Sequence, residues 1–140
     1  MARILPEEEN FDPDSFDEQD AREAFRTGVT LFNDGEYHAA HEEIENCWLA
    51  TESNDADFFK GLIQAAIALH HFRRDNLEGA RKLYSGHRRL LGKYMPQHRG
   101  VDVEGFLTAM QVALRPALRP DSQARYDFDA RPLIRAAATG

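Results

Sequence analysis

Residues 55–72 read DADFFKGLIQAAIALHHF, and this stretch decides the fold class of the chain. Its apolar residues occupy most sides of a helical wheel, which is typical of a helix that neighbours cover on more than one face. They are Phe58, Leu62, Ile63, Ala65, Ala66, Ile67, Ala68 and Leu69. We therefore expect a central, buried helix from about residue 55 to residue 72.

Apolar residues recur at helical spacing in four other segments, which predicts helices over residues 18–33, 36–51, 76–94 and 103–114. No segment alternates polar and apolar residues with β-branched enrichment, so we expect no sheet. The predicted fold is all-α, a compact antiparallel bundle of five to six helices. Residues 17–140 are expected to form a single helical domain, preceded by an acidic, extended leader over residues 1–16.

Similar residues recur in two parts of the chain at an offset of 40 residues. The offset pairs Phe32 with Phe72, Tyr37 with Leu77, Ala40 with Ala80, and Ile44 with Tyr84. This pattern predicts two tetratricopeptide-like helical hairpins, in which a small residue lets paired helices approach each other. A closed antiparallel bundle would produce the same spacing, so both arrangements stay open.

The composition excludes several classes of protein. A single cysteine, Cys47, cannot form an internal disulfide or a cysteine-rich zinc site, and we expect it to be an inert buried thiol. No apolar run approaches the ~20 residues that cross a bilayer, and the N-terminus lacks a signal-peptide pattern. We therefore expect a cytoplasmic protein with no membrane association.

The formal net charge of −7 is distributed unevenly. Residues 1–20 hold eight acidic side chains and one basic side chain, whereas residues 73–99 hold eight basic and two acidic ones. The basic stripe of the predicted helix 76–94 could meet an anion such as RNA. Because that stripe has no interleaved aromatic residues, nucleic acid is not the expected partner.

The densest polar cluster lies in the predicted helix 36–51. His41 and Glu45 are four residues apart and therefore lie side by side at the border of its apolar face. The segment begins like the zinc-protease motif H-E-x-x-H, but Glu45 replaces the second histidine, so we reject a protease. No motif for nucleophilic hydrolysis occurs, and whether the protein is an enzyme stays open.

Gln64 and His71 share one stripe of the predicted helix 55–72. In an antiparallel hairpin, Gln64 would face His41 and Glu45, and Gly61 would leave space beside them. The predicted site is a small polar pocket between these two helices, formed by His41, Glu45, Gln64, His71, Trp48 and Tyr37.

Two functions fit such a pocket. His41, Glu45 and His71 could hold a divalent metal, or the cluster could bind a small polar ligand, with Glu45 or His41 as a base. The alternative is a non-enzymatic helical protein-interaction module in which the polar groups only satisfy one another. His87, alone on an apolar helix face, is expected to be a core histidine.

Several sequence blocks occur in a characteristic order, namely FNDGEYHAAHEEIENCW at 32–48, GLIQ at 61–64, His71, and NLEGA at 76–80. Together they resemble domain-of-unknown-function family 309, small all-helical proteins of bacteria, archaea and plastids. The resemblance covers roughly residues 20–95, and it implies a compact helical bundle without an established activity.

The resemblance places the polar motif of the family on His41, Glu42, Glu45, Trp48, Gln64 and His71, and its glycines on Gly35, Gly61 and Gly79. Asp75 stands where members of this family often have glycine before the asparagine. This departure affects only the turn before residue 77.

Overall fold

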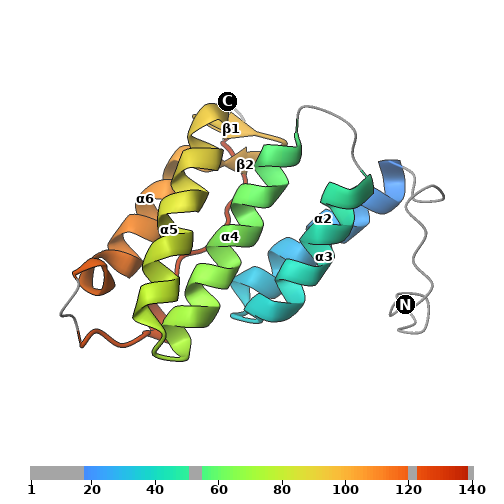
Figure 1. Cartoon of the computed structure of the whole chain (residues 1–140). Coiled ribbons are helices and arrows are strands. Elements are labelled where there is room, and N and C mark those ends of the chain that lie inside the picture. Colours follow the sequence, from blue (N-terminus) through green and yellow to red (C-terminus); the bar gives the residue numbers. More distant parts are fainter. Residues whose placement is uncertain (1–17, 51–54, 120–122, 139–140) are drawn as a thin grey trace.

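The computed structural model describes residues 18–50, 55–119 and 123–138, and these residues form five α-helices (Figure 1). The helices are α2 (Glu18–Asn33), α3 (Tyr37–Ala50), α4 (Ala56–Arg73), α5 (Leu77–Leu91) and α6 (Val103–Leu114). Short 3-10 helices follow at Gly92–Tyr94, Arg115–Leu118 and Phe128–Ala130. The predicted all-α class is confirmed. The predicted leader lies outside the described residues.

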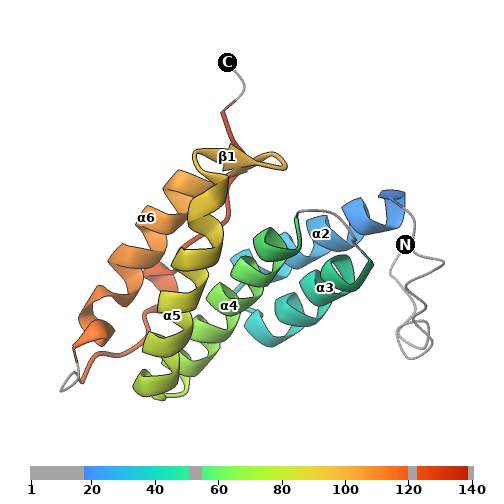
Figure 2. The same ribbon diagram turned by 45° about the horizontal axis from the view of Figure 1, so that its top comes forward.

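Helix α4 is the central helix of the bundle, with α3 against one side and α5 against the other (Figure 2). Ten of its residues are buried, as its apolar wheel predicts: Phe58, Phe59, Gly61, Leu62, Ile63, Ala65, Ala66, Ala68, Leu69 and Phe72. Helices α4 and α5 approach each other closely at Gly61 of α4. A Cβ at this position would lie only 2.7 Å from Leu91 Cγ of α5.

Short polar turns begin and end the helices. Gly35 ends the α2 segment at a φ of +84°, a left-handed conformation that favours glycine. Asn76 caps α5 by accepting a hydrogen bond from Gly79 N at 3.0 Å, and Asp102 caps α6 in the same way with Gly105 N at 2.9 Å. These caps satisfy amides that have no partner within the helix.

The core continues from α4 into both ends of the chain. Phe32 of α2 packs edge-on against Tyr37 of α3 and Phe106 of α6, with ring centroids 5.3 Å and 5.5 Å apart. All three side chains are almost fully buried. Each contributes about 1.5–3 kcal/mol by leaving water.

The C-terminal segment, residues 123–138, returns across the bundle to the turn between α2 and α3. Asn33 Nδ2 donates to the Ile134 carbonyl at 2.9 Å, and Ile134 N donates to Asn33 Oδ1 at 2.8 Å. Arg131 Nε donates to the Asn33 carbonyl at 2.7 Å. The segment therefore fixes the end of α2 from about 100 residues away in sequence.

A two-stranded hairpin corrects the prediction that there is no sheet. Strands β1 (Gln97–His98) and β2 (Val101–Asp102) pair antiparallel, and an isolated bridge joins Val101 to Ala136 of the C-terminal segment. The loop residues Arg99 and Gly100 have φ angles of +48° and +78°. Positive φ at both positions is typical of the tight type I′ turn, which suits a two-residue hairpin loop.

The basic stripe of α5 makes contacts within the bundle. Arg81 donates to the carbonyls of Ala117 and Arg119, and Arg88 donates to the carbonyl of Leu107 at 3.0 Å. Lys93 pairs with Asp57. Arg81 and Arg88 therefore join α5 to its neighbours, and Lys93 joins the 3-10 helix Gly92–Tyr94 to α4.

Helices α2 with α3 and α4 with α5 form two successive antiparallel hairpins (Figures 1 and 2). Their likeness to tetratricopeptide hairpins stays a prediction. Among the described residues, no helix has both the length and the apolar character needed to cross a membrane.

Candidate functional site

Helix α3 presents two histidine–glutamate pairs on its surface. His41 Nε2 lies 3.8 Å from Glu45 Oε2, and His38 Nε2 lies 3.9 Å from Glu42 Oε2. Both pairs are four residues apart, the spacing that puts side chains next to each other on a helix. The His41 side chain is 24% exposed and that of His38 is 70% exposed.

Helix α4 adds another histidine beside these pairs. The ring centroid of His38 lies 6.0 Å from that of His41 and 6.1 Å from that of His70. We call His38, His41 and His70, with Glu42 and Glu45, the histidine face. The histidine face consists of imidazole rings from α3 and α4 and of two carboxylates from α3.

His70 has an unusual environment for a histidine at a surface. Its Nδ1 is buried and has no hydrogen-bond partner. Burial lowers its pKa, and the positive charges of Arg73 and Arg74 lower the pKa further. Both effects favour the neutral form of the His70 imidazole.

The predicted stripe of Gln64 and His71 faces α5 and not α3. The Gln64 amide lies against Gly86, where an added Cβ would overlap it, and His71 Cδ2 lies 3.0 Å from the position of a Cβ on Gly79. His71 Nδ1 is 3.2 Å from Asn76 Nδ2. Gly79 and Gly86 of α5 provide the space that these polar side chains occupy. Gln64 therefore lies against α5 and does not face His41 and Glu45, which differs from the expectation.

The space beside Gly61 is also not part of a polar pocket. Leu91 of α5 fills it, as the close approach of these two helices requires. The expected opening next to His41 and Glu45 is therefore absent at Gly61.

Tyr37 and Trp48 belong to the core side of α3. Tyr37 is fully buried, and its hydroxyl lies 2.5 Å from the hydroxyl of Tyr126 in the C-terminal segment. Burial raises the pKa of Tyr37, as does its hydrogen bond with Tyr126. Trp48 is half-buried and packs against the core. Neither side chain joins the histidine face.

The predicted metal ligands His41, Glu45 and His71 do not form one site, because His71 faces α5 while the other two lie on α3. Over residues 18–50, 55–119 and 123–138, no three His, Cys, Asp or Glu side chains are arranged so that they could hold a metal ion as they stand. The histidine rings that lie near one another are those of His41, His38, His70 and His71, at successive centroid distances of 6.0, 6.1 and 6.2 Å.

Sequence reasoning missed His38 and His70. Adjacent residues on a helix point about 100° apart, so choosing His71 over His70 selects a different neighbouring helix. The signal that could have found His70 is the pairing register of α3 with α4, which brings residue 38 opposite residue 70.

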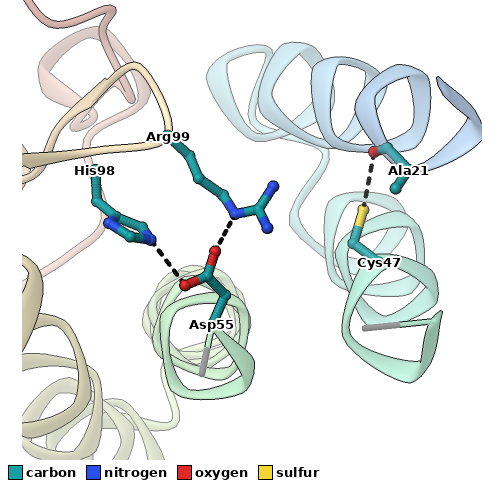
Figure 3. A network of polar contacts seen from close by, with 5 residues as sticks. All are labelled: Ala21, Cys47, Asp55, His98 and Arg99. Atoms are coloured by element: carbon teal, nitrogen blue, oxygen red, sulfur yellow. Dashed lines mark hydrogen bonds and ion pairs between the residues drawn. The ribbon is translucent and has the colours of Figure 1, made fainter. Parts of the chain in front are cut away.

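A second polar network lies at the N-terminal end of α4 (Figure 3). Asp55 accepts a hydrogen bond from Arg99 Nε and lies 3.0 Å from His98 Nε2. Burial would raise the pKa of Asp55, but the hydrogen bonds from Arg99 and His98 outweigh it and lower that pKa. This network attaches the hairpin loop to α4. Nearby, the Cys47 thiol is buried and donates to the Ala21 carbonyl of α2 at 3.5 Å.

The comparisons with known proteins relate the chain to one family. The family model for a domain of unknown function (DUF309) matches residues 25–83. Residues 25–83 belong to the DUF309 family. The DUF309 segment spans most of α2, all of α3 and α4, and the first half of α5, so it contains the whole histidine face. No curated protein matches the chain.

Proposed function

We propose that this DUF309 protein binds a divalent transition-metal ion on the histidine face, with His38, His41 and His70 as ligands. The observation that supports this proposal is the succession of three imidazoles from two helices at centroid distances of 6.0 Å and 6.1 Å. Imidazole is a borderline ligand that suits zinc, copper, nickel and iron.

The separations of the His38 ring from those of His41 and His70 are about 1 Å longer than the separation of two rings that share one metal ion. Two imidazoles bound to one tetrahedral zinc ion, with Zn–N bonds of about 2.0 Å, have ring centres about 5 Å apart. A shift of about 1 Å in the exposed His38 ring would bring its separation from a neighbouring ring into that range, and binding one ion would also require the rings of His41 and His70 to turn toward it. The His38 ring can move in this way by rotating about its side-chain bonds, because the side chain is 70% exposed.

Glu45 can complete the ligand set. Its carboxylate lies 3.8 Å from His41 Nε2 and is 43% exposed, so it can turn toward an ion bound at His41. Three imidazoles and one carboxylate form a four-ligand set for zinc, with oxygen and nitrogen donors of the usual kinds.

The test is zinc uptake by protein purified without a histidine tag. Equilibrium dialysis against micromolar zinc, followed by elemental mass spectrometry, should give one ion per chain. His38→Ala, His41→Ala and His70→Ala should each remove it, because each deletes a ligand. His71→Ala should retain the ion, since His71 faces α5. It is therefore the matched control, and circular dichroism should show that all four variants are folded.

Two results would contradict the proposal. One is the absence of stoichiometric uptake of zinc, nickel, cobalt or copper by the wild-type protein. The other is uptake that His71→Ala removes as fully as His70→Ala does, which would point to the ligand set first predicted from the sequence.

The second candidate function is a helical protein-interaction module in which the polar groups are purely structural. The observation that favours it is that His41 and His38 each lie beside a glutamate of their own helix. In that case no metal binds, and His41→Ala should lower the free energy of unfolding by ~0.5 kcal/mol, the usual size of such pairs.

A further inference from the structure

A cavity of about 490 Å³ lies between α2, Phe59 of α4, the hairpin loop and the C-terminal segment. Its wall is apolar, and the side chains that form it are Phe25, Val29, Phe59, Val101 and Ile134. Phe59, Val101 and Ile134 are almost fully buried. A volume of this size is in the range of small-molecule sites.

Four arginines surround this apolar wall, and we call them the arginine rim: Arg22, Arg26, Arg99 and Arg135. Arg99 is the member that pairs with Asp55, and its guanidinium lies 5.1 Å from the Phe59 ring centroid (Figure 3). Within the described part of the chain, Arg22, Arg26 and Arg135 have no ion-pair partner. Among the residues that the structure describes, no acidic side chain lines the cavity.

The backbone holds this rim in place. Ala137 N donates to the Gly100 carbonyl at 2.8 Å, and Asp102 N donates to the Arg135 carbonyl at 3.0 Å. The loop that carries Arg99 and the segment that carries Arg135 are therefore joined to each other. Arg22 and Arg26 are one helical turn apart on α2, where like charges repel by a few tenths of a kcal/mol. An anion placed between them would relieve that repulsion.

A second cavity differs from the first in the charges that line it. The other cavity, of about 540 Å³ between α6 and the C-terminal segment, is lined by Asp102 and Asp129 as well as by Arg131 and Arg135. Charges of both signs there neutralise one another. The described side chains that line the cavity beside α2 carry positive charges without a negative one among them.

We propose that the cavity beside α2 binds an amphipathic anion, a carboxylate on an unbranched apolar chain of medium length. The apolar chain would lie against Phe25, Phe59 and Ile134, and the carboxylate would meet the guanidinium groups of Arg22, Arg26 and Arg135. Guanidinium is the side chain best suited to pair with a carboxylate, because it presents two parallel N–H donors. This site is independent of the histidine face.

Isothermal titration of the full chain with three probes tests the proposal. Decanoate carries both the charge and the chain, decanol carries the chain alone, and inorganic phosphate carries charge alone. Decanoate should bind saturably at one per chain. Decanol should bind about tenfold more weakly, and phosphate should show no saturable binding. Raising the salt to 1 M should weaken decanoate binding, because salt screens exposed charges.

Variants separate the two parts of the site. Arg22→Gln and Arg26→Gln should each weaken decanoate binding about threefold to tenfold, with decanol binding unchanged. Arg125→Gln is the matched control, because this arginine is 84% exposed and lies outside the cavity, and it should change nothing. Val29→Phe should reduce binding of both decanoate and decanol by filling the cavity.

Three results would overturn the proposal. Absence of saturable decanoate binding would do so directly. Equal binding of decanol and decanoate, unaffected by the arginine variants, would show that the arginine rim has no role. Phosphate binding as tight as decanoate binding would show that the apolar wall has none.

Discussion

The amide oxygen of Gln64 in α4 is buried against Gly86 of α5, where it accepts no hydrogen bond. A side chain at residue 86 would overlap this amide, so glycine is the residue that lets α4 and α5 pack with Gln64 between them. A buried carbonyl without a partner costs ~1–3 kcal/mol. The contact of these two residues is therefore a tight but poorly satisfied part of the helix interface.

The first prediction is a coupling between these two residues. In a Gln64→Ala background, Gly86→Ala should raise the free energy of unfolding by ~0.5–1 kcal/mol, since alanine favours the helix and no amide is displaced. In the wild-type background the same change should be less favourable by ~1 kcal/mol. Chemical denaturation of the four proteins measures this difference. Additive effects within the measurement error would contradict the packing of Gln64 on Gly86.

The helices could be predicted from the sequence to a large extent. The bounds of α2 and α6 agree with the predicted ranges 18–33 and 103–114, because apolar periodicity and cap residues both mark their ends. The hairpin could not be predicted. Its strands have two residues each, and its loop uses Arg99 where asparagine or aspartate would have been a recognisable signal.

The candidate site could be predicted only in part. His41 and Glu45 are neighbours because their spacing fixes their relation within one helix. The partners on α4 could not be derived, since they depend on which stripe of that helix meets α3. Helix α4 packs against both α3 and α5. The side chains of His71 and Gln64 face α5, where they lie against Gly79 and Gly86. The periodicity of a single helix shows which of its residues share a face, but it does not show which neighbouring helix that face contacts.

The second prediction concerns the turn between α4 and α5. Asp75 has a φ of +62°, a conformation that costs most residues about 1–2 kcal/mol and costs glycine little. Asp75→Gly should therefore raise the free energy of unfolding by ~1 kcal/mol, although its weak, exposed contact with Arg125 is lost. Asp75→Ala should lower the free energy of unfolding, because alanine tolerates a positive φ less well than aspartate or glycine does. Thermal denaturation that ranked alanine above glycine would refute this account.

The third prediction concerns the hydroxyl pair of Tyr37 and Tyr126. Tyr126→Phe should lower the free energy of unfolding by ~1–3 kcal/mol, because the fully buried Tyr37 hydroxyl loses its partner. Tyr37→Phe should cost less, since Tyr126 is only half-buried and its hydroxyl can turn to water. Urea denaturation of the two variants compares these losses. Equal losses would indicate that the Tyr37 hydroxyl has another acceptor.

The fourth prediction concerns His87, a fully buried histidine of α5 that packs against Tyr84 and Phe106. Its Nδ1 contacts the Tyr84 carbonyl, and its Nε2 is buried without a partner. Burial lowers its pKa to about 4, a shift that the positive charge of Arg88 reinforces and the Tyr84 carbonyl opposes. The folded protein therefore keeps this imidazole neutral under conditions in which the unfolded chain protonates it.

The sign of the pH dependence follows from this difference. Above pH ~6.5 both states are neutral at His87, and its contribution to stability is complete. Between pH ~6.5 and pH ~4 the unfolded state binds the additional proton, so the free energy of unfolding should fall as the pH falls, by about 3 kcal/mol at most. His87→Phe, which retains an aromatic ring against Phe106 and cannot titrate, should reduce this slope. Part of the slope should remain, because burial also lowers the pKa of His70. Guanidinium denaturation at intervals between pH 4 and pH 7 measures both curves, and parallel curves would show that His87 has the same pKa in the folded and unfolded states.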